Sequence, residues 1–225
     1  MNAETVVKFR PDLFAIAPER IKRLPVDPDR GYPVPWFVAW VDGKPEFRVA
    51  DARKYARAVR EKLCWVCGER LGRHVAFVIG PMCAINRVSA EPGSHRDCAE
   101  FSARACPFLS KPAMTRREDH LPAEVKRDSY FGGVGLAHNP GGTLLYLPMD
   151  FARIPDGRGG HLFKLGEPLA VEWYTLGRRA TRAEAAELLH TGALRLRKLA
   201  AESGPVALKE FERLHKRALD LLPES

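Results

Sequence analysis

The stretch "LCWVCGERLG", residues 63–72, places Cys64 and Cys67 two residues apart and follows them with a glycine. Such a pair can form half of a metal site, a redox couple, or two buried thiols. A second pair, His95 and Cys98, follows after 27 residues. Zinc takes four nitrogen or sulfur ligands in a tetrahedron, and two close pairs supply them with little strain in the chain. The spacing therefore favours a local metal site.

The sequence around the second pair fits a closed metal shell. In "PGSHRDCAEFSARA", Ser94 is a natural N-cap, which would place His95 and Cys98 in the first turn of a helix. The predicted ligands are Cys64, Cys67, His95 and Cys98, with Cys83 as an alternative to His95. Four protein ligands leave no position for water, so the zinc is expected to be structural. A redox pair would need a preceding strand, whereas a basic helix is expected here.

The predicted order of knuckle, hairpin and ligand-bearing helix resembles a treble-clef zinc finger. The resemblance covers residues 64–106 and extends to no other part of the chain. The same module occurs in HNH nucleases, which use a histidine base, an asparagine and a metal-binding histidine, and His74, Asn86 and His95 stand in that order. However, His74 follows an arginine where that family has an aspartate, and "HVAFVIGPM" offers no oxygen ligands for a catalytic divalent ion.

The charge of the chain favours an anionic partner, nucleic acid first. The sequence has 36 Lys plus Arg against 28 Asp plus Glu, a formal net charge of +8. Arginines gather near the cysteine pair, and the candidate contacts are Arg53, Arg57, Arg60, Arg70, Arg73 and Arg87. Trp65, between the cysteines, is a candidate for stacking on a base or for anchoring a protein partner. The alternatives are a solvated arginine face and a tryptophan that covers the thiolates.

The rest of the chain predicts an α+β fold. An aromatic-rich hairpin with an Asp-Gly turn is expected over residues 36–49, and Asp51 is placed to cap the basic helix that follows. The segments "FGGVGLAHNPGGTLLYLPM" and "GGHLFKLGEPLAVEWYTLG" are typical of strands separated by glycine-rich turns. The treble-clef-like module is therefore expected to combine with an antiparallel β-sheet and C-terminal amphipathic helices.

Two amphipathic helices are expected at the end of the chain. Thr181 and Glu184 form a capping-box pattern before the first, and Pro205 opens the second. Gly192 is a candidate interruption of the first helix. The apolar faces of these helices would pack on the sheet or form a homodimer interface.

Three segments are expected along the chain. Residues 1–35 carry six of the 18 prolines and are predicted to be an extended, proline-rich arm. Residues 36–110 would hold the hairpin, the basic helix and the zinc module, and residues 121–225 the sheet and the C-terminal helices. The charged stretch "SKPAMTRREDHLPAEVKRDS", residues 110–129, is the predicted boundary, with one continuous domain as the alternative.

Composition also argues against a membrane or a secreted protein. No apolar run approaches the roughly 20 residues that span a bilayer, and the N-terminus lacks the apolar core of a signal peptide. The five cysteines cluster between Cys64 and Cys106, unlike the spread framework of a secreted disulfide scaffold. A cytoplasmic location without a membrane partner is therefore expected.

Together these features predict a zinc-stabilised, non-enzymatic binding protein with nucleic acid as its partner. The first alternative is an adaptor or inhibitor that binds another protein, by analogy with compact basic proteins encoded by phages and mobile elements. The second alternative is an HNH-like, metal-dependent nuclease that uses His74 and Asn86.

Overall fold

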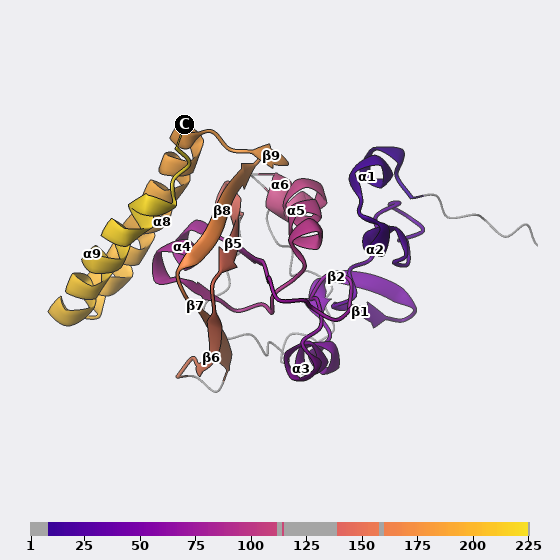
Figure 1. Ribbon diagram of the computed structural model, residues 1–225, viewed down its shortest axis with the longest axis horizontal. Helices are drawn as coiled ribbons and strands as arrows, with labels where there is room; N and C mark the ends of the chain where they lie inside the picture. Colours follow the sequence, from indigo (N-terminus) through magenta and orange to yellow (C-terminus); the bar gives the residue numbers. More distant parts are fainter. Residues whose placement is uncertain (1–8, 112–113, 115–138, 158–159, 225) are drawn as a thin grey trace, which may run out of the picture.

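The computed structural model describes residues 9–111, 114, 139–157 and 160–224. The fold is mixed α and β, with antiparallel sheets and a pair of helices at the C-terminus (Figure 1). The predicted α+β class is therefore confirmed. Most of the predicted boundary, residues 110–129, lies outside the described residues.

The described chain forms short helices in its first half and longer helices at its end. The helices are α1 (Pro11–Ile16), α2 (Glu19–Lys22), α3 (Ala52–Glu61), α4 (Pro81–Asn86), α5 (Arg96–Ala105), α6 (Pro107–Ser110), α8 (Arg182–Glu202) and α9 (Pro205–Ala218), followed by the 3-10 turn η1 (Leu219–Leu221). The strands are β1 (Val38–Val41), β2 (Lys44–Ala50), β3 (Phe77–Ile79), β4 (Val88–Ser89), β5 (Thr143–Pro148), β6 (Phe151–Pro155), β7 (His161–Leu165), β8 (Pro168–Thr175) and β9 (Arg178–Arg179). Their orders in the sheets are β1-β2, β3-β5-β8-β9 and β4-β7-β6.

Strand β5 is buried along its whole length because helices cover both faces of its sheet. Successive side chains of a strand point to opposite faces. Accordingly, Leu144 and Tyr146 join the core beneath α4, α8 and α9, whereas Leu145 and Leu147 pack with alanines of α5. This two-sided burial explains the unbroken apolar run "TLLYLP", where a sheet with one face in water would alternate.

The chain between the two ligand pairs differs from the hairpin expected of a treble clef. Strand β3 pairs with β5, and β4 pairs with β7, so neither pairs with the other. Helix α4 stands between them, and a single antiparallel bridge, Ala76 to Ser94, brings the two arms together near the ligands. Residues 36–110 and 121–225 thus contribute strands to the same two sheets and side chains to one core.

The N-terminal segment, residues 9–34, is more helical than the predicted extended arm. Helices α1 and α2 occupy part of it, and Leu13, Ala17 and Ile21 are buried at a spacing of four residues. The prolines permit this, since Pro11 lies in the first turn of α1 and Pro18 immediately precedes α2. Apolar spacing, and not proline content, therefore decides the local structure of this segment.

Two predicted helix caps are observed in the structure, and one predicted helix interruption is not. Asp51 accepts hydrogen bonds from two backbone N–H groups in the first turn of α3, and Thr181 and Glu184 form the capping box of α8. Gly192 does not interrupt α8, which continues through it. A Cβ at this position would lie 2.9 Å from the Cβ of Pro81, so the glycine permits α8 to approach α4 closely.

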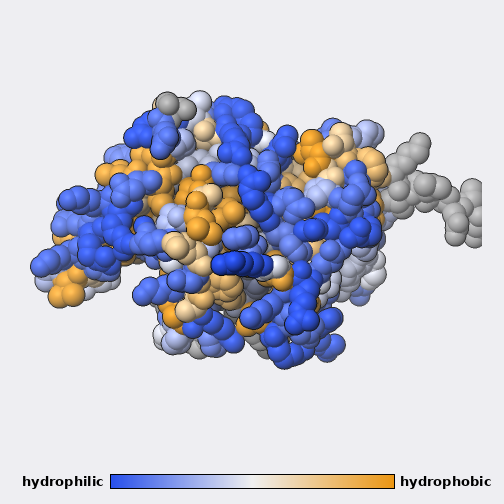
Figure 2. All heavy atoms as spheres, viewed as in Figure 1, coloured by the Kyte–Doolittle hydropathy of each residue, from blue (hydrophilic) through white to orange (hydrophobic). Residues whose placement is uncertain are grey.

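The α8–α9 pair covers one side of the sheet and extends beyond it (Figure 1). Phe211 and Ala218 are buried in the main core, whereas Leu194, Leu199 and Val206 are exposed. In the view of Figure 2, polar residues cover most of this pair and apolar patches interrupt them. Among the described helices, none combines the length and the apolar character that crossing a bilayer requires.

Replacing Gly192 by valine should lower the free energy of unfolding by about 2 kcal/mol, because overpacking of a core contact typically costs about 1–3 kcal/mol. Urea denaturation followed by circular dichroism measures this difference. Ala201→Val is the matched control, because Ala201 is exposed on the same helix. Valine has a higher helix propensity than glycine and a lower one than alanine, so a loss at Gly192 no larger than that at Ala201 would contradict the close approach to Pro81.

Candidate metal centre

Four side chains from two parts of the chain converge at the start of α5. Cys64 and Cys67 come from the turn after α3, which we call the knuckle (residues 64–67), while His95 precedes α5 and Cys98 lies in its first turn. One ligand atom of each residue lies within 4.8 Å of the other three. The Nδ1 of His95 is 3.5 Å from the Sγ of Cys67 and 4.0 Å from the Sγ of Cys98. Ligands of a tetrahedral zinc ion lie roughly 3.5–3.8 Å apart, so the group is close to the geometry of a bound ion.

Two backbone N–H groups point at one sulfur atom of the knuckle. The Sγ of Cys64 accepts from the N–H of Cys67 at 3.5 Å and from the N–H of His95 at 3.4 Å. These donors favour the thiolate form of Cys64. Gly68 completes the turn with φ of +76°, and the ring of Trp36 lies 2.6 Å from where its Cβ would stand. A side chain at this position would be strained and would collide with the indole ring.

The start of α5 orients the imidazole ligand. His95 is itself the N-cap residue, one position later than the predicted Ser94. Ser94 is buried and forms the bridge to Ala76. The Nε2 of His95 lies 3.1 Å from the carbonyl oxygen of Arg70. With Nε2–H donating to that carbonyl, Nδ1 is left as the metal ligand.

The three thiols cannot all ionise without a compensating cation. Hydrogen bonds from the side chains of Cys67 and Cys98, together with the backbone N–H groups, lower the pKa of Cys64. Hydrogen bonding to Cys64 raises the pKa of Cys67 to about 12, and hydrogen bonding to Cys64 and Cys67 raises the pKa of Cys98. These opposite shifts favour ionisation of Cys64 over that of Cys67 and Cys98 in the cluster alone, whereas a divalent cation would hold all three as thiolates. These four residues can hold a metal ion, as their spacing in the sequence predicted.

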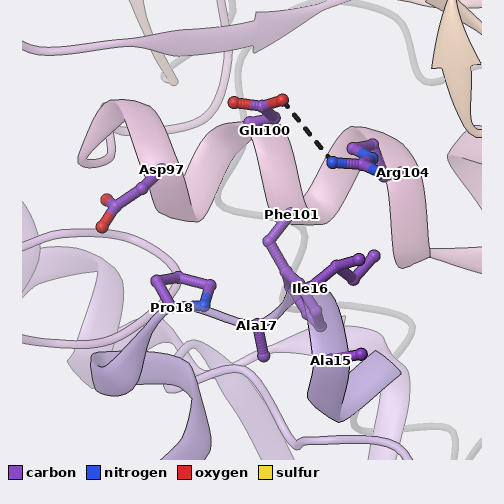
Figure 3. Close-up of a pocket in the computed structure, with 8 residues that line it drawn as sticks. All are labelled: Ala15, Ile16, Ala17, Pro18, Asp97, Glu100, Phe101 and Arg104. Atoms are coloured by element: carbon purple, nitrogen blue, oxygen red, sulfur yellow. Dashed lines mark ion pairs between the residues drawn. The ribbon is translucent and has the colours of Figure 1, made fainter. Parts of the chain in front are cut away.

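A shallow groove of about 210 Å³ lies beside this centre, between the α1–α2 connection and α5 (Figure 3). Phe101 and residues 15–18 form its apolar side, and Asp97, Glu100 and Arg104 complete its lining. Glu100 and Arg104 form an ion pair at 3.8 Å. Pockets that enclose drug-sized ligands measure about 300–1,000 Å³. The groove is therefore a seam between the N-terminal segment and α5, and it does not form a second ligand site.

The other two cysteines lie outside the metal-binding group. Cys83 is on α4, packed against the main core, and burial raises the pKa of its thiol to about 11. Cys106 follows α5 and is partly buried. Cys83 is therefore not placed to substitute for His95, and the predicted alternative ligand is not part of the observed group.

The arginines predicted on α3 are exposed, but two of them have an acidic neighbour. Arg57 and Arg60 both pair with Glu61, at 3.3 Å and 2.6 Å. Arg57 also lies over the ring of Trp36, 5.7 Å from its centroid. Arg53 has no ion-pair partner among the described residues. The three arginines on α3 keep an excess of positive charge, because a single carboxylate is shared between two of their guanidinium groups.

The remaining predicted arginines separate into two kinds. Arg87 pairs with Glu167 at 2.7 Å and its side chain is 11% exposed, so it stabilises the turn between β7 and β8 and does not offer a binding surface. Arg70 and Arg73 are exposed and, within the described chain, form no ion pair. Lys62 shares these properties and was missed from the sequence, although its place two residues before Cys64 was a signal.

Trp65 is a core residue, which corrects its prediction as a surface contact. Its ring is stacked on Phe37 with centroids 4.9 Å apart, and Tyr55 meets it edge-on at 5.8 Å. Only 2% of Trp65 is exposed. Neither a base nor a partner protein can reach this ring in the folded chain. It anchors the knuckle to α3 instead.

The nuclease residues do not assemble into one site. His74 is exposed in the loop before β3, whereas Asn86 is exposed at the end of α4, after that strand. His95 turns Nδ1 toward two cysteine sulfurs. The order His74, Asn86, His95 in the sequence therefore has no counterpart in a common cluster of the described residues.

Comparisons with protein-family models, with curated proteins and with solved structures find no match to this chain. The metal centre and its surroundings therefore carry the functional argument.

Serine at Cys64, Cys67 or Cys98 should remove most of the bound metal, because each variant deletes one of four ligands. Elemental analysis of purified protein gives the metal content per chain. Cys83→Ser and Cys106→Ser are matched controls that remove thiols outside the group. Metal lost from Cys83→Ser and retained in Cys98→Ser would overturn the ligand assignment.

Metal binding at neutral pH should release about two protons from the thiols, those of Cys67 and Cys98, because their raised pKa values keep them protonated until the cation arrives. Since protons are products, metal affinity should rise with pH and fall as the solution is acidified. Titration calorimetry in buffers of different ionisation enthalpy counts the protons. Binding without proton release would mean that Cys67 and Cys98 are already ionised before the metal binds, which would contradict their raised pKa values.

Proposed function

We propose that this protein is a zinc-stabilised, non-enzymatic nucleic-acid-binding protein. The observation that carries the proposal is a group of exposed basic side chains beside the metal centre, Lys62, Arg70 and Arg73, which we call the knuckle patch. Among the described residues these three have no acidic partner. Basic groups left without counter-charges are suited to binding phosphates.

Zinc is the metal that best fits the donor set. Three thiolates and one imidazole are typical of structural zinc sites, whereas Mg²⁺ and Ca²⁺ prefer oxygen ligands. The four positions of a tetrahedral ion would all be taken by Cys64, Cys67, His95 and Cys98. A filled shell leaves no place for a reacting water, which supports a structural role and a non-enzymatic protein. The part of the treble-clef resemblance that concerns the ligands, a knuckle pair followed by a pair at the start of a helix, points in the same direction.

The metal centre would hold the knuckle patch in a fixed shape. The backbone N–H of Leu71 donates to the carbonyl of Lys62 at 2.8 Å, and Leu63 forms an antiparallel bridge with Arg70. The carbonyl of Arg70 in turn accepts from the metal ligand His95. Lys62 and Arg70 therefore lie on adjoining chains that are tied to the ligands, and a rigid scaffold lowers the entropic cost of binding.

Helix α3 would extend this basic surface. It leads directly into Lys62, and Arg53 lies nine residues earlier, roughly 14 Å away along the helix axis. Arg57 and Arg60 lie between them with a single carboxylate, that of Glu61. Exposed ion pairs of this kind are weak and exchange readily, so both arginines remain available to phosphates.

A protein-binding adaptor or inhibitor is the second candidate. The observation that favours it is the exposure of Leu194, Leu199 and Val206 on the α8–α9 pair, outside the part that packs on the sheet. Apolar side chains at a helix surface can mark a protein contact. A protein of this kind would bind its partner through α8 and α9, and a homodimer would use the same surface.

The nucleic-acid proposal predicts strong salt dependence. A short DNA duplex and an RNA of the same sequence, followed by fluorescence anisotropy at several salt concentrations, should bind more weakly as salt rises. Replacing Lys62, Arg70 and Arg73 together by glutamate should abolish binding or reduce the slope of log K against log salt by about 2–3, since each phosphate contact contributes about 0.9.

The matched control carries the same charge change on α8, with Arg195, Arg197 and Lys198 replaced by glutamate. These side chains are exposed and form no ion pair within the described chain. Both variants should keep their zinc, as measured by elemental analysis. Equal losses of affinity would mean that net charge, and not the knuckle patch, drives binding, and no binding to DNA or RNA at low salt would refute the proposal.

A further inference from the structure

The N-terminal segment, residues 9–34, is attached to the rest of the protein by side chains alone. Its backbone hydrogen bonds within the described chain stay inside the segment, as between Asp27 and Tyr32 and between Val34 and Pro25. The first backbone bond to another part of the fold comes after it, from the N–H of Trp36 to the carbonyl of Val66. No sheet or helix ladder therefore fixes this segment in place.

The apolar side chains that attach the segment rest on the metal centre. Leu13, Ala17 and Ile21 belong to one buried cluster with the metal-binding cysteines. The members contributed by the rest of the protein are Cys64, Val66, Cys67, Cys98, Phe101 and Ala105. Ile21 is completely buried there. The surface that receives the segment is thus built by the knuckle and α5, the two elements that the metal would join.

One charged side chain of the segment pairs with residues next to the metal ligands. Arg20 on α2 forms an ion pair with Asp97 at 3.2 Å and approaches Glu69 at 3.9 Å. Partial burial acts against its positive charge, but nearby negative charge, first that of Asp97, prevails and raises the pKa of Arg20. Arg23 also pairs with Glu69, at 2.5 Å, but it is mostly exposed. Arg20 therefore approaches carboxylates on both sides of the metal centre, Glu69 two residues after Cys67 and Asp97 immediately before Cys98.

The close-up of the seam shows the same arrangement from the side of α5. Ile16, Ala17 and Pro18 lie across from Phe101, while Asp97 stands at the end of the helix nearest α2 (Figure 3). Contacts of the segment with the β1–β2 hairpin are weaker, a 4.0 Å approach of Lys44 to Asp29 and a distant ring contact of Arg30. The metal centre and α5 are thus its main support.

We infer that the N-terminal segment is a lid on the metal centre, which the bound ion locks in place and which in turn slows loss of the ion. A divalent ion with three thiolates and one neutral imidazole carries one net negative charge, which Arg20 would balance. The ion also joins the knuckle to α5, so its departure loosens the surface under Ile21 and frees Glu69 and Asp97, the two carboxylates that Arg20 approaches, to move apart. The inference rests on the metal occupancy in the proposed function and is independent of nucleic-acid binding.

Hydrogen exchange tests whether the ion holds the N-terminal segment in place. It is measured on the full-length protein before and after zinc is removed with a chelator. Amides of residues 9–34 should lose protection, while amides of α8 and α9 keep theirs. Unchanged protection of residues 9–34 after metal loss would overturn the inference, and so would loss of protection over the whole chain. A protein that contains no zinc and takes up none would overturn the proposed metal site as well.

Metal transfer tests the lid without unfolding the protein. In zinc-loaded protein, Ile21→Ala should speed the passage of Zn²⁺ to a chromogenic chelator by about tenfold, as expected for loss of a buried contact, and Arg20→Gln, which removes a partly exposed ion pair, by about fivefold. Arg23→Gln, which removes an ion pair to the same Glu69, is the matched control and should change the rate less than about twofold. Equal rates in all three variants and the unmodified protein would refute the lid.

Discussion

The convergence of three thiols and one imidazole at the start of α5 is the constraint on which the surrounding structure depends. Sulfur atoms this close cannot all carry charge unless a cation lies between them. The two ligand pairs are separated by 27 residues in the sequence, and few backbone bonds join their surroundings: the N–H of Trp65 donates to the carbonyl of Gly93, and Ala76 forms a bridge with Ser94. A bound ion would add a cross-link through four side chains. The knuckle and α5, which this cross-link joins, support the N-terminal segment, the buried Trp65 and the knuckle patch.

The sheet and its helices form a second region whose stability has another source. Strand β5 is covered on both faces, and α4, α8 and α9 complete a large apolar core that contains none of the proposed ligands. This core follows ordinary packing rules, and we expect it to persist when the metal is removed. The protein thus combines a conventional hydrophobic core with a smaller region organised by a cluster of polar and charged groups. The basic surface that we propose for binding belongs to the second region.

Local rules made part of this structure predictable. The ligand set followed from two pairs at short spacing, and the starts of α3 and α8 followed from the capping residues Asp51 and Thr181. The α+β class followed from hydrophobic patterns. Helices α1 and α2 were not predicted, because six prolines favour an extended chain, whereas buried residues four positions apart stabilise helical turns there.

Contacts between distant parts of the chain could not be predicted from the sequence. The pairing of β3 with β5 joins residues near 78 and 145, and no periodicity within either strand specifies its partner. The burial of Trp65 depends on Phe37 and Tyr55, which come from the hairpin and from α3. The ion pair of Arg87 with Glu167 likewise crosses the fold and removes a predicted binding residue. Charge alone could not separate such a structural arginine from an available one.

The central claim is that Cys64, Cys67, His95 and Cys98 hold one zinc ion in a closed shell. X-ray absorption spectroscopy at the zinc edge of the purified protein tests it most directly. We expect three sulfur neighbours at about 2.3 Å and one nitrogen neighbour at about 2.0 Å, with no further ligand. A shell of oxygen and nitrogen atoms without sulfur, or one that includes a bound water, would contradict it.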